Sequence, residues 1–138
     1  MNEKGNTGIV QQVYRAFSRK DLPAILELQA EDAHWSVAGS AQEIPWAKPK
    51  PGRDGVAEFL KILGEWLVAE QFEIREYLAA ADTVVALGYQ RGYVKPTRTP
   101  YEFDFVHVWK LRTGKIASFR VYYDTAYVAS VLRDKSVP

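Results

Sequence analysis

Cysteine is absent from the 138-residue sequence, and histidine occurs only twice. Without thiols the chain can form neither a disulfide framework nor a thiolate nucleophile. Two histidines also make no recognisable metal site, because metals in proteins usually take three or four such ligands. No segment approaches the ~18 consecutive apolar residues of a membrane span, and the polar start MNEKGNTG lacks the apolar core of a signal peptide. We therefore expect a cytoplasmic protein with no membrane contact and no metal.

Neither sign of charge predominates in the sequence. Eighteen basic and 17 acidic residues leave a net charge of +1, and no basic stripe indicates a nucleic-acid partner. No glycine-rich phosphate loop follows a strand, and no serine or cysteine nucleophile lies near a recognisable base, so we expect no cofactor. What the sequence does contain is 47% hydrophobic residues, enough to fill the core of one domain spanning residues 1–138.

Hydrophobic periodicity predicts helices in the first half of the chain. A first helix is expected to begin at Asn6 or Thr7, with an apolar stripe along one side. A second helix is capped by Asp21 and buries Leu22, and a third covers residues 54–68. Before this third helix, three prolines and two glycines predict a loop.

The second half of the chain reads as a sheet. A short strand before the loop is followed by four strands in a row, at residues 33–37, 72–80, 83–94, 101–111 and 115–123. Their connections are short enough for antiparallel neighbours, and Asp124 caps a short helix after the last strand. Helices followed by a sheet predict an α+β domain with the helices on one face.

The two central strands carry the candidate site residues. Because side chains alternate along a strand, His107 shares one face with Phe103 and Phe105. On the preceding strand, alternation groups Arg91 with Tyr89, and we expect both faces to point inward. An imidazole and a guanidinium among aromatic rings predict a pocket for a small organic molecule.

Three stretches resemble the NTF2-like superfamily in its SnoaL-like and ketosteroid-isomerase-like branch. They are VQQVYRAFSRKDLPAILELQAEDAHW, GRDGVAEFL and FVHVWKLRTGKIASFRVYYDTAYVASVL, and they occur in the family's order. The resemblance implies a cone-shaped (cystatin-like) fold, in which three N-terminal helices pack on a curved, mostly antiparallel sheet and a short helix ends the chain. It also implies a hydrophobic pocket at the wide end of the cone and a homodimer formed through the convex face of the sheet.

The isomerases of this branch use a tyrosine on the first helix, an aspartate base after the first strand and a protonated aspartate on the sheet. The resemblance places these positions on Val13, Val37 and His107, with Tyr14 one residue beyond the first. Because neither acid position holds a carboxylate, steroid isomerisation by that mechanism is not expected.

Two other branches differ in their fit to the sequence. The epoxide hydrolases need an arginine and an aspartate two residues apart on one strand, whereas Tyr93 stands two residues after Arg91. The polyketide cyclases place a histidine on the penultimate strand, which His107 matches. They also place an acid–base aspartate near the end of the last strand, where Asp124 stands.

The resemblance implies a cofactor-independent isomerase, cyclase or hydratase for a hydrophobic carbonyl compound. His107, helped by Asp124, would move a proton, and Arg91 or Tyr14 would stabilise an enolate-like oxygen. Six aromatic residues would contact the ligand: Trp35, Trp46, Tyr89, Phe103, Phe105 and Tyr123. Trp46 belongs to the proline-rich loop and would help this loop close on the ligand as a lid.

Each assignment has a structural alternative. His107 could be satisfied by a neighbouring hydroxyl or carbonyl. Arg91 could form an ion pair with Glu102, Asp104 or Asp124, or could reach solvent at the rim of the sheet. Asp124 could act only as a helix cap. The whole domain could then be a ligand-binding module without turnover, or a dimeric adaptor that works through its convex sheet face.

Overall fold

The computed structural model describes residues 2–38, 43–47 and 50–133. Helices come first and a sheet follows, as the sequence predicts. In chain order the elements are α1 (Glu3–Ser18), α2 (Leu22–Glu27), β1 (Gln29–Val37), the 3-10 turn η1 (Pro45–Ala47), α3 (Gly52–Trp66), β2 (Leu67–Ala80), β3 (Thr83–Val94), β4 (Pro100–Arg112), β5 (Lys115–Tyr122) and α4 (Thr125–Arg133). No helix in these described ranges is long and apolar enough to cross a membrane.

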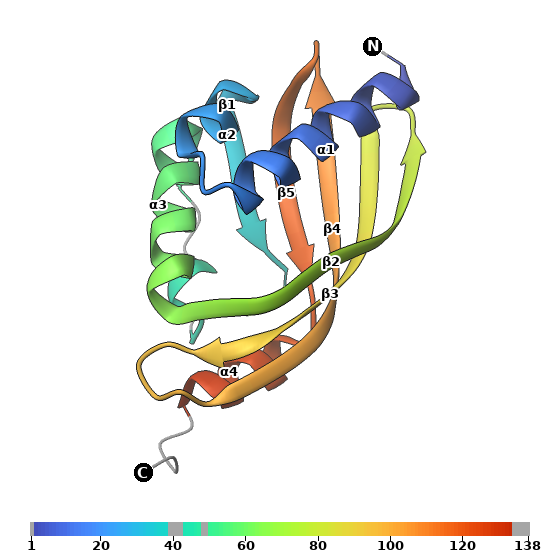
Figure 1. Cartoon of the computed structure of the whole chain (residues 1–138). Helices are drawn as coiled ribbons and strands as arrows, with labels where there is room; N and C mark the ends of the chain where they lie inside the picture. The colour runs from blue at the N-terminus through green and yellow to red at the C-terminus, as the bar shows by residue number, and fades with distance from the viewer. Residues whose placement is uncertain (1, 39–42, 48–49, 134–138) are drawn as a thin grey trace.

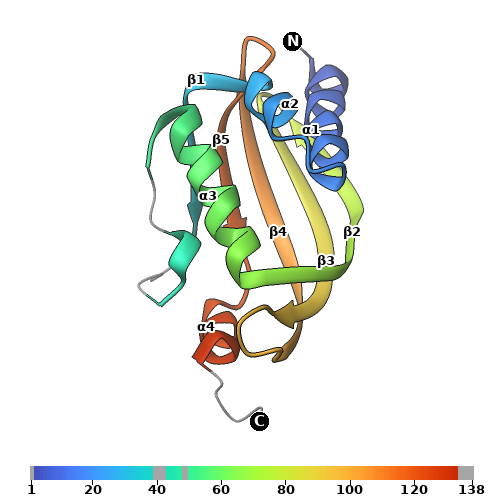
Figure 2. The ribbon, with the colours of Figure 1, turned by 60° about the vertical axis from the view of Figure 1, so that its left-hand side comes forward.

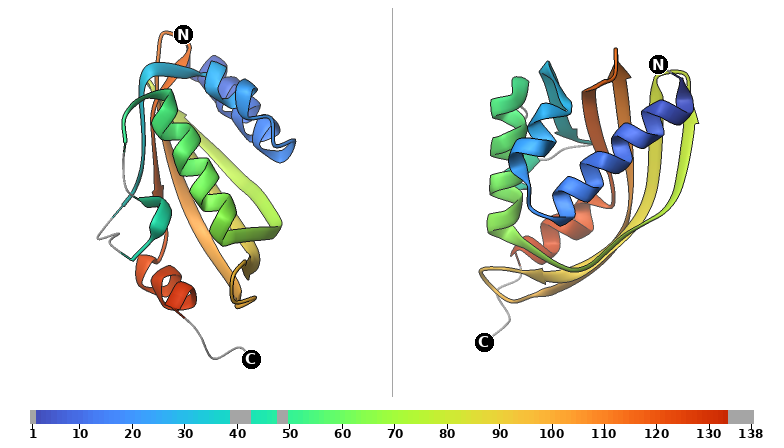
Figure 3. Two further views of the ribbon diagram at one scale, coloured as in Figure 1. Left: turned by 90° about the vertical axis from the view of Figure 1, so that its left-hand side faces the viewer. Right: turned by 45° about the horizontal axis from the view of Figure 1, so that its top comes forward.

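One strongly curved sheet organises the molecule (Figure 1). Its strand order is β1-β5-β4-β3-β2, and only the β1–β5 pair is parallel. Helices α1 and α3 lie on the same side of the sheet, and α2 lies between α1 and α3, near the start of β1 (Figures 2 and 3). The short helix α4 lies at the end of the sheet, beside the connection between β3 and β4 (Figure 1). The expected α+β architecture, with three N-terminal helices on a curved and mostly antiparallel sheet, is confirmed.

The curvature has a local cause in β2 and β3. The β2–β3 pairing shifts register twice, between Ala69 and Gln71 and between Ile74 and Glu76, and such irregularities bend a strand. The partner strand has glycine where the chains approach most closely. A Cβ atom at Gly92 would lie 1.8 Å from a backbone oxygen of β2, so only glycine permits this approach.

Most of the apolar patterning of the helices is reproduced, with three local corrections. Helix α3 covers Gly52–Trp66 instead of residues 54–68, and β2 begins directly after it at Leu67 instead of at residue 72. Helix α1 begins at Glu3 with Asn2 as its cap, one turn before the expected start at Asn6 or Thr7. Asp21 caps α2 as predicted, since its carboxylate accepts a hydrogen bond from the Ala24 amide. Leu22, however, is 38% exposed, because the first turn of α2 extends past the edge of the core.

Candidate functional site

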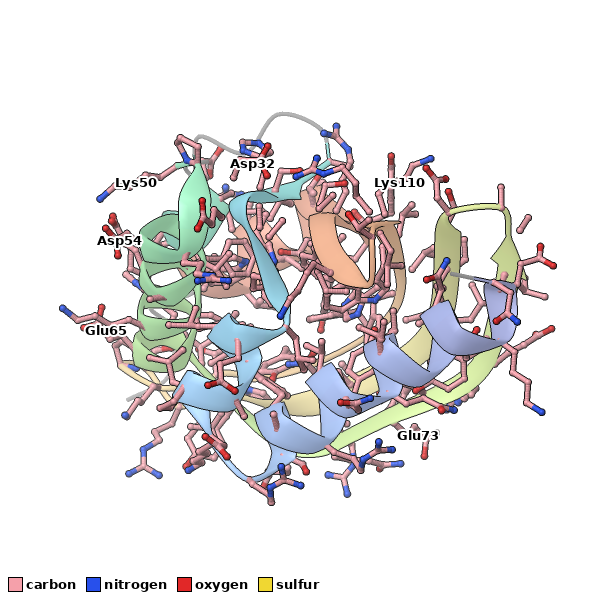
Figure 4. All side chains as sticks on the ribbon, turned by 90° about the horizontal axis from the view of Figure 1, so that it is seen from above. Asp32, Lys50, Asp54, Glu65, Glu73 and Lys110 are labelled. Atoms are coloured by element: carbon pink, nitrogen blue, oxygen red, sulfur yellow. The ribbon has the colours of Figure 1, made fainter. Side chains whose placement is uncertain are left out.

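A cavity of about 80 Å³ lies between the helices and the concave face of the sheet. Helices α1, α2 and α3, the η1 turn and all five strands contribute side chains to it. Most of these side chains are aromatic or aliphatic, and none of the described lining residues is an aspartate, glutamate, lysine or arginine. The charged side chains labelled in Figure 4, among them Asp54, Glu65 and Glu73, project from the outside of the molecule. The interior is therefore an aromatic chamber without formal charge.

His107 is the polar centre of this chamber. Strand β4 directs it inward, where it is only 9% exposed. Its ring stacks on Phe105 with the centroids 4.1 Å apart, and the ring of Phe119 lies at 4.8 Å. Burial among these rings lowers the pKa of His107 to about 3, because a charged imidazolium would lose its hydration there. The imidazole is therefore neutral at physiological pH.

Tyr14 supplies the hydrogen bond that His107 makes to the protein. Its hydroxyl oxygen lies 2.6 Å from His107 Nδ1 and also accepts a hydrogen bond of 3.0 Å from Trp109 Nε1. Burial raises the pKa of Tyr14 well above its ordinary value, so the hydroxyl keeps its proton. Three side chains from α1 and β4 thus form one buried hydrogen-bonded chain.

Two further polar pairs reach the cavity. Trp46, from η1, donates its indole N–H to the Tyr123 hydroxyl at 3.2 Å, and burial raises the pKa of this tyrosine as well. On β3, the Gln90 amide nitrogen donates to the Tyr101 hydroxyl at 2.9 Å. The amide and the two hydroxyls are uncharged, so they add polar contacts without an acid or a base.

Seven of the ten candidate site residues line the cavity. His107 and Tyr14 do so together with five of the expected aromatic residues: Trp35, Trp46, Phe103, Phe105 and Tyr123. Trp46 packs into the interior at 2% exposure, so its part of the proline-rich segment does cover the chamber. Residues 39–42 and 48–49 of that segment lie outside the described residues.

The expected partnership of His107 with Asp124 is wrong. Asp124 is exposed at the start of α4, where its carboxylate accepts a hydrogen bond of 3.0 Å from the Tyr127 amide. It does not line the cavity, and its role is the helix cap that the sequence offered as the alternative. Strand β5 ends at Tyr122, so the chain turns away from the chamber before the carboxylate is reached.

The expected inward direction of Arg91 and Tyr89 is also wrong. The Arg91 side chain is 50% exposed, bonds Gln71 at 2.9 Å and lies 3.9 Å from the Glu70 carboxylate. Tyr89 donates its hydroxyl proton to Glu102 on the outer face. In the β3–β4 pairing Ala86 stands opposite His107, and paired residues share a face. The even-numbered residues of β3 therefore face the cavity, and the odd-numbered ones face outward.

Several of the residues that line the cavity were not candidates from the sequence, among them Trp109, Phe119 and Gln90. Trp109 follows His107 by two positions, so alternation alone could have identified it. Phe119 pairs with Trp109 across β4 and β5, and Gln90 pairs with Phe103 across β3 and β4. Finding those two required the register of the strands. Among the described residues, no three His, Asp or Glu side chains are grouped as metal ligands would be.

Comparison with known proteins places this geometry in context. The sequence model for the SnoaL-like domain matches residues 10–119. An NTF2-like protein from Burkholderia xenovorans LB400 is 29% identical, with a TM-score of 0.87 over 96% of this chain and 99% of the other. An NTF2-like protein of unknown function from Burkholderia pseudomallei K96243 is 25% identical, with a TM-score of 0.84 over 97% and 100%. TerC, crystallised with polyporic acid, is 25% identical, with a TM-score of 0.82 over 94% and 99%. No protein of curated function matches the sequence.

Proposed function

The chain belongs to the SnoaL-like family, and on this premise we propose that it binds a compact hydrophobic carbonyl compound. The carbonyl oxygen would contact His107, and the rings of the chamber would enclose the rest of the ligand. One observation carries the proposal: a hydrogen-bonded imidazole, held by Tyr14, lies in an aromatic cavity whose described lining residues bear no charge.

The lining selects the chemical class of the ligand. Burying an ion without a countercharge costs far more free energy than burying a neutral polar group that finds a hydrogen bond. A carboxylate would meet no arginine or lysine among the described lining residues, whereas a ketone oxygen needs only one donor. TerC, which was co-crystallised with polyporic acid, has the same fold at 25% identity, which supports a small organic molecule as the class of ligand.

The volume limits the size of the ligand. An apolar cavity of roughly 150 Å³ accommodates benzene, and the chamber measures about 80 Å³. A ligand with one aromatic ring therefore requires that some lining rings rotate as it enters. Phe17, Phe72 and Phe103 are the lining phenylalanines best placed for this, because all three are only partly buried.

The same site favours electrophilic assistance over proton abstraction. A buried neutral imidazole is a weak base, but a fixed N–H aimed at a carbonyl stabilises negative charge that develops on its oxygen. An isomerase or cyclase activity of this chain would therefore rest on polarisation of the carbonyl by His107, and not on a His107–Asp124 acid–base pair.

Binding of three probes of similar shape tests the proposal. Acetophenone carries the carbonyl, ethylbenzene lacks it, and benzoate carries a charge. We expect acetophenone to quench tryptophan fluorescence at the lowest concentration. In His107→Phe its affinity should fall by about 3- to 10-fold, as expected for one lost hydrogen bond, and the ethylbenzene affinity should change little.

The matched control is His34→Phe, because His34 is the second histidine and is exposed on β1. This variant should bind all three probes like the wild type. Equal affinity of the wild type for acetophenone and ethylbenzene, or tightest binding of benzoate, would refute the proposal. Hydrogen–deuterium exchange of the acetophenone methyl group, followed by NMR, tests the catalytic extension. Exchange that is no faster with wild type than with His107→Phe would refute that extension.

A further inference from the structure

The Trp109–Tyr14–His107 chain has a direction. An indole Nε1 carries a proton and can only donate, so the Tyr14 oxygen must accept the 3.0 Å bond from Trp109. The hydroxyl proton of Tyr14 is then free to be donated to His107 Nδ1, 2.6 Å away. In the opposite arrangement Nδ1 would donate to Tyr14. The hydroxyl proton of Tyr14 would then have no acceptor among the described residues, which is costly for a buried group.

The direction of the chain decides which imidazole nitrogen carries the proton. In a neutral imidazole one nitrogen donates and the other accepts, and Nδ1 is the acceptor here. The proton therefore resides on Nε2. Nδ1 is the one ring nitrogen of His107 that has a hydrogen-bond partner among the described residues, and the His107 ring lines the cavity. The chamber thus offers an N–H donor to whatever enters it.

We propose that Tyr14, oriented by Trp109, is a positioning residue that holds His107 in the Nε2–H tautomer and thereby makes the site specific for hydrogen-bond acceptors. The inference rests on the proposed ligand site and adds which ligands that site prefers. A ketone or ester oxygen satisfies the N–H, whereas a ligand with only a donor, such as an indole, leaves two protons facing each other. Tyr14 contacts His107, the residue that would bind the ligand. It determines which nitrogen of His107 donates a hydrogen bond, without acting on the ligand itself.

The tautomer can be measured in the ligand-free protein. Long-range ¹H–¹⁵N correlation spectra of ¹⁵N-histidine protein distinguish Nε2–H from Nδ1–H, and the His34→Phe variant assigns the signals. We expect His107 to show the Nε2–H pattern in the wild type and a mixture of tautomers in Tyr14→Phe. Tyr77→Phe is the matched control, since it also removes one hydroxyl beside Tyr14, with the ring centroids 6.3 Å apart, but Tyr77 belongs neither to the chain nor to the cavity lining. It should leave the pattern unchanged.

A binding readout follows from the same variants. The preference for acetophenone over indole should fall by about fivefold in Tyr14→Phe, the value of one lost hydrogen bond, and should persist in Tyr77→Phe. An Nδ1–H or charged imidazole in the wild type, or identical His107 spectra in wild type and Tyr14→Phe, would overturn the inference. Loss of probe binding with the tautomer effect intact would instead refute only the proposed ligand site, so the two failures are distinguishable. Unfolding midpoints of both variants verify that they are folded.

Discussion

The buried neutral imidazole predicts how the stability of the protein depends on pH. The pKa of His107 is about 3 in the folded protein and about 6.5 in an unfolded chain. Between these values the unfolded state binds a proton that the folded state does not, so the free energy of unfolding decreases as the pH falls. The contribution is fully present above pH 6.5 and is lost progressively towards pH 3. Between pH 7 and pH 5 the loss is about 2 kcal/mol, at a slope approaching ~1.4 kcal/mol per pH unit.

The comparison variant is His107→Gln, which does not titrate and can still accept a hydrogen bond from Tyr14. Urea unfolding at pH 7, 6 and 5, followed by circular dichroism, gives the free energy of unfolding of each protein. We expect the difference between wild type and variant to shift by about 2 kcal/mol across this range.

Other groups that titrate in acid are shared by both proteins and cancel in the comparison. Hydrogen bonds from Arg112 and Arg75 hold the pKa values of the Asp32 and Glu73 carboxyls below their usual range, but both carboxyls are on the surface. Around His107 itself the ring contacts come from Tyr14, Phe72, Phe105, Trp109 and Phe119. The variant His34→Gln should behave like the wild type. A wild-type minus His107→Gln difference that stays flat from pH 7 to pH 5 would refute the argument that His107 is buried and uncharged.

Three further predictions concern the rest of the molecule. Gly92→Ala should destabilise the fold by more than about 2 kcal/mol in urea unfolding, because its Cβ would collide with the β2 backbone. The control Gly64→Ala, on the open side of α3, should stabilise the fold by roughly 0.5–1 kcal/mol. Equal effects of the two substitutions would contradict the close-approach explanation. Asp124→Ala should lose about 1 kcal/mol of stability as a missing cap, while Asp124→Asn should keep both the stability and the acetophenone affinity; a drop in affinity in Asp124→Asn would return this residue to the binding site. The chain should run in light scattering as a dimer of 15.7 kDa subunits, and Val108→Arg on the outer sheet face should make it monomeric; a monomeric wild type at micromolar concentration would count against the dimer.

The sequence predicted the inward face of β4 correctly, since that face depends only on alternation within one strand. Trp109, Phe105 and His107 recur every second position, and the polar Glu102 and Asp104 alternate with them. A long strand of this kind reveals its buried side without any knowledge of its neighbours.

The face of β3 could not be obtained in the same way. The larger side chains of this strand, such as Leu87 and Tyr89, point outward, and the inner positions are occupied by small residues such as Ala86 and Gly88. A sheet bent this sharply leaves little room on its concave side, so size is a poor guide to burial here. The connection between β3 and β4 sets the pairing of odd with even positions, and a change of one residue in register would have brought Arg91 inward.

Tyr14 reaches the site from a helix position next to the one that the family resemblance indicated. The family resemblance placed the functional tyrosine at Val13, and a neighbouring position on a helix is turned by about 100°. In the structure both Val13 and Tyr14 line the cavity, because α1 lies across the concave face and presents more than one row of side chains. From its rotated position the Tyr14 hydroxyl meets the imidazole nitrogen, 2.6 Å away. The sequence could indicate Tyr14 and His107 as site residues, but not the hydrogen bond between them.

The pH behaviour of binding connects these observations to mechanism. A proton-transfer site built on a histidine and a carboxylate would gain or lose activity near neutral pH, where an ordinary imidazole titrates. His107 keeps one protonation state throughout that range, since its pKa is about 3. Tyr14, its one hydrogen-bond partner among the described residues, stays protonated as well. Affinity for an uncharged ketone should therefore be constant between pH 5 and pH 8, even though the protein loses stability over the lower part of that range. If His107 is a neutral donor, the affinity stays constant while the free energy of unfolding falls. A histidine that acts as a base would instead give an affinity that changes with pH in this range.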